Sequence, residues 1–273
     1  REEGVYLGKS NQSTQEINSQ AQNPLGTAPV GGLIAKFAIP AIISMLVSAM
    51  YNIVDQIFIG QGVGMLGNAA TNVAFPVTTI ATALALLLGI GGASNYNLEM
   101  GAGQEKKASG IAGTALSSLV ISGLILAVIA LVFLKPLLTL FGATTDVMPY
   151  AVDYTGITAL GLPFYILSVG GNHVVRADRS PTYSMTCIMI GAIINTILDP
   201  VFIFVFGWGI KGAAWATVIG QVVSGVLVIV YFWKFRNMYL TGAMLKPKMP
   251  YLKAIISLGL ASCINQIAMA IVQ

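Results

Sequence analysis

The sequence predicts an all-α protein that crosses a membrane several times, and three observations support this fold class. Hydrophobic residues make up 56% of the 273 residues and charged residues only 9%. The mean hydropathy is +0.80, far above the average of a soluble domain. Seven apolar segments follow a polar start, near residues 33 to 59, 67 to 98, 110 to 134, 149 to 173, 182 to 206, 213 to 235 and 254 to 273. Each of the first six meets or exceeds the ~20 residues that a spanning helix needs.

The distribution of positive charge predicts the orientation in the bilayer, because Lys and Arg concentrate in cytoplasmic loops. With a cytoplasmic N-terminus, 12 basic residues lie inside and only Lys135 and Lys211 lie outside. The inner set is Arg1, Lys9, Lys36, Lys106, Lys107, Arg176, Arg179, Lys234, Arg236, Lys246, Lys248 and Lys253. We therefore predict a multi-pass protein of the plasma membrane whose first partner is the lipid bilayer.

The pattern along the chain predicts four regions. Residues 1–32 are polar and read as a disordered cytoplasmic tail. Residues 33–236 hold six apolar segments, and short connections such as Gly60 to Leu66 predict that sequential helices pack as antiparallel neighbours. Residues 237–250 contain Lys246, Pro247, Lys248 and Pro250, which is the composition of a linker between two halves. Residues 251–273 begin a further helix.

Composition also excludes some classes of function. The net charge of +4 comes from dispersed loop residues without interleaved aromatics, so no nucleic-acid partner is expected. Cys187 and Cys263 lie in apolar segments without a CxxC motif and read as small buried hydrophobic residues.

Two carboxylates stand inside the predicted spans and are the strongest candidates for function. Asp55 belongs to the first apolar segment and Asp199 to the fifth. A carboxylate at bilayer depth costs roughly 2.5 to 3.5 kcal/mol on insertion scales, so such a residue is a functional candidate by default. Cation or proton coupling is the expected chemistry, and a paired or protonated structural carboxylate is the alternative.

Residues at the same depth extend this candidate site. At 1.5 Å per residue, Asp55, Asp199 and Thr217 lie within roughly 6 to 10 Å of the outer boundary. Asn195 and Asp199 are four residues apart, so both project from one helical face. Amide, hydroxyl and carboxylate oxygens together suit a hard monovalent cation such as Na⁺. For Asn195 or Thr217 alone, an interhelical hydrogen bond is the competing interpretation.

Other residues near the two aspartates are secondary candidates. Tyr51 stands one turn before Asp55, and Pro200 removes the helical donor of the Thr196 carbonyl, which becomes a further possible ligand. Tyr51 and Met50 are candidates to line a substrate path. Asp153 lies near the start of a predicted helix, where a carboxylate fits the helix dipole. The run Gly89, Gly91, Gly92 and Ala93 favours close helix approach.

Several motifs together resemble a known family. They are Tyr51-Asn52-Ile53-Val54-Asp55 with Ile59-Gly60, the turn Gly101-Ala102-Gly103, and Asn195 to Pro200 followed by Gly207 to Thr217. These stretches resemble the multidrug and toxic compound extrusion (MATE) family, and the last is the most specific. The resemblance covers residues ~25 to 273. It implies the first six-helix lobe of a two-lobe, twelve-helix transporter plus part of a seventh helix.

The resemblance also implies a function. In that family a cation site in the first lobe is formed at positions that match Asp55, Asn195, Asp199 and Thr217. Members exchange Na⁺ or H⁺ for cationic, amphipathic compounds by alternating access, with no cofactor beyond the coupling ion. The second lobe of the transporter is the implied protein partner, and no enzymatic reaction is expected.

Three alternatives stay open on the sequence alone. A related lipid-linked oligosaccharide flippase would be expected to have a basic cavity, whereas no Lys or Arg stands mid-helix here. A membrane-embedded aspartyl enzyme would need two aspartates that share one site, and the GxGD motif is absent. A noncatalytic assembly subunit is the third alternative.

Overall fold

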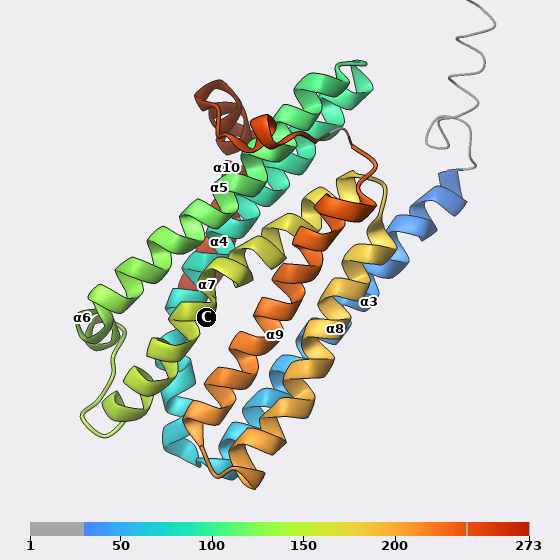
Figure 1. Ribbon diagram of the computed structural model, residues 1–273. Helices are drawn as coiled ribbons and strands as arrows, with labels where there is room; N and C mark the ends of the chain where they lie inside the picture. The colour runs from blue at the N-terminus through green and yellow to red at the C-terminus, as the bar shows by residue number, and fades with distance from the viewer. Residues whose placement is uncertain (1–29, 239, 273) are drawn as a thin grey trace, which may run out of the picture.

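A computed structural model describes residues 30–238 and 240–272, which form a bundle of long helices (Figure 1). Seven of the described helices are long and apolar enough to cross a membrane, which confirms the predicted fold class. They are α3 (Val30–Gly62), α4 (Met65–Gly101), α5 (Glu105–Val132), α7 (Met148–Ala177), α8 (Pro181–Pro200), α9 (Ile210–Val230) and α10 (Met249–Val272). The predicted tail, except for its last residues, lies outside the described residues.

Short elements that the sequence did not predict interrupt or extend these helices. The helix α6 (Leu134–Leu140) follows α5 directly after Phe133. Two π-helical turns, η1 (Val201–Val205) and η2 (Tyr231–Phe235), continue α8 and α9. Pro200 stands where α8 gives way to η1, as expected for a residue that cannot donate a helical hydrogen bond. The 3₁₀ turn η3 (Gly242–Leu245) lies in the predicted linker, whose role as a domain boundary stays a prediction.

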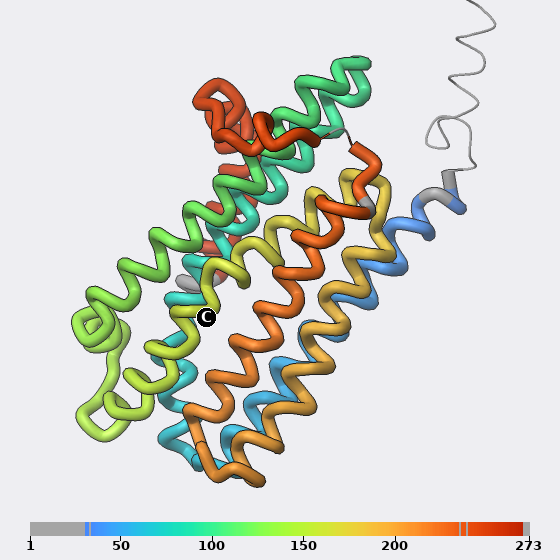
Figure 2. The backbone as a smooth tube through the Cα atoms, viewed as in Figure 1, coloured from blue at the N-terminus to red at the C-terminus, as the bar shows by residue number. Residues whose placement is uncertain are grey.

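The packing of α3 differs from the sequence-based expectation. Short turns make α4 and α5, and α8 and α9, close antiparallel neighbours as predicted. In contrast, α3 packs mainly along α8 and touches α4 only slightly, although the two are consecutive (Figures 1 and 2). The residues of α3 that are buried include Asp55 and Ile59, and Ile59 packs in one cluster with Ile203 of η1. The prediction that α3 and α4 pack as a pair was wrong, because α3 buries its residues mainly against α8.

Small residues fix the closest helix contacts, as the glycine series predicted. A Cβ added at Gly89 would lie 2.5 Å from the backbone of Gly170, so α4 and α7 touch through their main chains. Gly123 of α5 meets the backbone of Pro163 in the same way at 2.6 Å. In a membrane, where lipid competes equally for apolar side chains, van der Waals contact at such close approach is one of the forces that hold helices together.

Helix α10 also packs along α4 through glycines that let the two main chains touch. A Cβ on Gly91 would overlap the carbonyl oxygen of Ile255, and one on Gly259 would overlap the carbonyl oxygen of Leu87. Asn95 of α4 adds a hydrogen bond from its Nδ2 to the Ala254 carbonyl at 3.0 Å. Two glycines and one amide therefore set the register between α4 and α10.

A buried carboxylate joins several elements at one end of the bundle, which we call the linker end because the chain leaves α9 there. Asp178 lies in the turn between α7 and α8 and is 1% exposed. Its Oδ1 accepts from the Tyr96 hydroxyl at 3.1 Å, and its Oδ2 accepts from the Tyr231 hydroxyl at 2.8 Å and the Asn237 N–H at 2.7 Å. Burial raises the pKa of Asp178, whereas the hydrogen bonds from Asn237, Tyr231 and Tyr96 lower it. The start of the predicted linker is thus tied to α4 and to the α7–α8 turn.

The α4–α10 contact makes a stability prediction. We expect Gly91→Ala to lower the melting temperature of the purified protein, because overpacking at a backbone contact costs about 1–3 kcal/mol. Gly101→Ala is the matched control, since a Cβ there would meet open space. Equal melting temperatures for the two variants would show that α10 does not pack on α4 as described.

The Asp178 cluster makes a second stability prediction. Asp178→Ala leaves the Tyr96 hydroxyl and the Asn237 backbone N–H without their acceptor and removes one of the acceptors of the Tyr231 hydroxyl. Each buried unsatisfied group costs about 1–3 kcal/mol. We expect a clear loss of thermal stability, with Asp146→Ala as an exposed control. Tyr96→Phe removes one of the three bonds and is expected to fall between them. An Asp178→Ala protein as stable as Asp146→Ala would refute the structural role.

Candidate cation site

Two buried polar residues of α8 belong to the site. Asn195 and Asp199 lie one turn apart and are 3% and 0% exposed. Helix α9 approaches this face closely, because a Cβ added at Gly220 would lie 2.8 Å from the carbonyl oxygen of Gly191. The two glycines let Thr217 of α9 come within reach of Asn195.

The Asn195 amide connects the two helices. The two hydrogen bonds of the Asn195 side chain form when its amide oxygen and nitrogen exchange places. In that orientation the amide nitrogen donates to Asp199 Oδ2 at 3.3 Å, and the amide oxygen accepts from the Thr217 backbone N–H at 3.2 Å. Its amide group also lies 3.5 Å from the Thr217 hydroxyl oxygen. A buried amide that is held at both ends orients the neighbouring carboxyl group.

Helix α3 brings Asp55 to the same place. Asp55 is 7% exposed, and its carboxyl group lies close enough to that of Asp199 for the two to interact electrostatically. Gln56 Nε2 donates to Asp55 Oδ2 at 3.3 Å, while Asp55 Oδ1 is buried and has no hydrogen-bond partner among the described residues.

The ligand atoms fit a small monovalent cation. The site offers carboxyl, amide and hydroxyl oxygens from α3, α8 and α9, which are the ligands that hard cations prefer. A buried carboxyl oxygen without a partner is costly, and a bound cation would satisfy it. The structure therefore brings together the four residues that the sequence selected, although their binding role stays a prediction.

The secondary candidates lie in different surroundings. Tyr51 interacts electrostatically with both Asp55 and Asp199, so it belongs to the surroundings of the site. Met50 is 60% exposed on α3 and lies on the surface of the helix. Asp153 forms an exposed ion pair with Lys211, 3.4 Å apart, in agreement with a structural role.

Sequence reasoning missed two polar neighbours of the site. Tyr154 of α7 lies beside Thr217, and Gln56 contacts Asp55. Gln56 Oε1 also accepts from the Thr71 hydroxyl of α4 at 3.1 Å. Applying the depth argument to uncharged polar residues of every span would have found both.

The comparison with protein families decides the affiliation. The sequence profile of the MatE family matches residues 40–201, which is more than half of the chain. The chain belongs to the MatE family. The family membership predicted from the motifs around Asp55 and Asp199 is therefore confirmed.

Relatives of this MatE protein include two curated transporters and many solved structures. The chain is 31% identical to the multidrug export protein MepA of Staphylococcus haemolyticus over 196 residues, 72% of this chain and 43% of that protein. It is 33% identical to an FAD transporter of Shewanella oneidensis over 215 residues, 75% of this chain and 47% of that protein. A crystal structure of MATE in complex with MaD3S superimposes with a TM-score of 0.81 at 29% identity, covering 87% of this chain and 54% of that one. The MatE protein described here spans about half the length of these relatives.

Proposed function

We propose that this chain supplies a six-helix lobe, 33–236, of a cation-coupled antiporter that exports small organic compounds by alternating access. The observation that carries the proposal is the gathering of Asp55, Asn195, Asp199 and Thr217 from three helices around a buried carboxyl oxygen without a partner. The MatE affiliation and the similarity to MepA, a multidrug export protein, support it. The segment from 251 onward would then begin the second lobe.

The placement of the basic residues supports the proposed orientation. Helix α6, which contains Lys135, and the α8–α9 connection, which Lys211 follows, lie toward one end of the bundle (Figure 1). The start of α5 with Lys106, the α7–α8 turn with Arg179 and the segment after η3 with Lys246 belong to the linker end (Figure 1). Under the positive-inside rule the linker end faces the cytoplasm. The cation site then lies in the outer half of the membrane.

The paired carboxyl groups offer a physical basis for coupling. Two buried carboxylates close together repel each other, so the pair holds a proton or a cation between its oxygens. Coupling arises when occupancy of the pair shifts the equilibrium between two conformations of the lobe, which requires a difference in affinity between them. Asn195 and Thr217 contribute by fixing the orientation of the Asp199 carboxyl group.

The charge of the lobe favours cationic, amphipathic cargo. The two buried carboxyl groups stand among spans that carry no basic residue near mid-membrane in the described part of the chain. A flippase for pyrophosphate-linked lipids would need the opposite polarity. The FAD transporter among the relatives moves a different class of compound by its name, so cargo charge is the property that transport assays must compare.

The argument against an aspartyl enzyme comes from the family to which the chain belongs and not from the arrangement of the two aspartates. Asp55 and Asp199 do share one site, as an aspartyl enzyme would require. The relatives named above are transporters, and both carboxyl groups are buried within packed helices. An assembly subunit without transport activity would lack any Na⁺ or H⁺ response.

Ligand linkage tests the cation site. If Na⁺ binds the four residues, replacing choline chloride by NaCl is expected to raise the melting temperature, by a stabilisation of about 2.7 kcal/mol at a hundredfold excess over Kd. Asp199→Asn is expected to lose this shift, whereas Asp153→Asn, with its exposed carboxylate, is expected to keep it. A full Na⁺ shift in Asp199→Asn would exclude the assignment.

Vesicle transport tests the coupling. In proteoliposomes that contain the complete gene product, efflux of a cationic dye is expected to follow an imposed Na⁺ or H⁺ gradient. Asp55→Asn and Asp199→Asn are expected to lose this dependence, and Asp153→Asn to retain it. An anionic flavin nucleotide serves as the comparison cargo. Efflux that ignores both gradients, or equal loss in all three variants, would contradict the proposal.

A further inference from the structure

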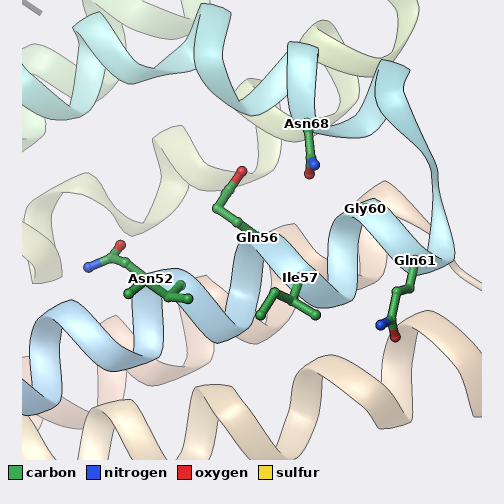
Figure 3. Close-up of a pocket in the computed structure, with 7 residues that line it drawn as sticks. Asn52, Gln56, Ile57, Gly60, Gln61 and Asn68 are labelled. Atoms are coloured by element: carbon green, nitrogen blue, oxygen red, sulfur yellow. The ribbon is translucent and has the colours of Figure 1, made fainter.

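A cavity opens between α3 and α4 because α3 packs along α8 instead of along its neighbour in sequence. It is a depression of about 650 Å³ that is widely open to the surface of the described chain. Four carboxamide side chains line it, those of Asn52, Gln56, Gln61 and Asn68. In Figure 3, Gln56 of α3 and Asn68 of α4 extend toward one another across the gap.

The carboxamides are unusual within spans that are apolar enough to cross a membrane. Each carries two N–H donors and a carbonyl acceptor, and such groups need partners inside a membrane. Asn68 Oδ1 is buried without a hydrogen-bond partner among the described residues. Amides gathered around a cavity with an unsatisfied acceptor indicate a place where a polar ligand or water enters.

Gln56 is the residue that the cavity shares with the cation site. Its Nε2 donates to Asp55 Oδ2 at 3.3 Å, and its Oε1 accepts from the Thr71 hydroxyl at 3.1 Å. These two bonds hold the amide plane across the space between α3 and α4. A fixed amide plane presents its edge to a ligand in one orientation.

We propose that this cavity binds an uncharged planar ring that carries a lactam or imide edge. Such an edge offers adjacent donor and acceptor atoms, and a side-chain carboxamide recognises that arrangement by a pair of hydrogen bonds, as it does with a nucleobase. None of the lining residues that the structure describes is charged, and Ile53 and Ile57 supply apolar contact for the ring. The site lies outside the set of four residues proposed for the cation and defines a cargo group that the proposed antiport function leaves open.

The test uses lumiflavin, a fluorescent and uncharged ring with one imide N–H, and the purified protein in nanodiscs. Binding is followed by fluorescence anisotropy in choline chloride without Na⁺. Gln56→Met and Asn68→Leu keep side-chain volume but remove the hydrogen bonds, and each is expected to weaken binding by roughly tenfold or more. Gln104→Met, an exposed amide before α5, is the matched control and is expected to bind as the wild type does.

A second probe keeps the test independent of folding defects. In 3-methyl-lumiflavin the imide N–H is blocked, and the wild-type protein is expected to bind it roughly tenfold less tightly. Equal affinity for the two probes, or unchanged lumiflavin binding in both Gln56→Met and Asn68→Leu, would overturn the proposal, as would absence of binding to the wild type. Because no cation gradient is used, failure of the coupling proposal leaves this result unaffected, and the reverse also holds.

Discussion

The pair formed by Asp55 and Asp199 is the interaction on which the arrangement of the bundle depends. A carboxyl group inside a membrane needs a polar partner or a bound ion, and α3 and α8 place these two groups in one buried site. This requirement draws α3 onto α8 and away from α4. The cavity between α3 and α4, the exposure of the remaining faces of α3 and the connection through Gln56 all follow from that one pairing.

Close helix approach is the second condition for the site. Without the contact of Gly191 with Gly220, Thr217 would stand too far from Asn195 to hold its amide. Larger residues at these positions would separate α8 from α9 by the width of their side chains. The polar groups of the site are thus positioned by residues that have no side chains of their own.

Sequence was sufficient for the spans and for selecting four residues that the structure brings together, although their role as a site stays a prediction, and the reasons differ. Hydropathy predicts spans because bilayer thickness sets helix length, and residues at matched depth, such as Asp55 and Asp199, can meet whatever the order of the helices. Helix order itself depends on which faces fit, so the α3–α8 pairing was not predictable from loop lengths. Gln56, Tyr154 and Asp178 escaped notice because uncharged polar residues within a span and a carboxylate in a loop have ordinary explanations until their partners are known.

The register of α10 against α4 has a consequence for movement. Gly91 and Gly259 place main chain against main chain, and Asn95 ties the two helices near the linker end. Sliding one helix past the other would drive a backbone oxygen into a Cα, so these contacts oppose a relative translation of α4 and α10. Asn68, which lines the cavity, lies toward the other end of α4, and Pro76 stands between the two places. Because a proline inside a helix removes a backbone hydrogen bond, bending at Pro76 would move the cavity end of α4 while the contact with α10 stays in place.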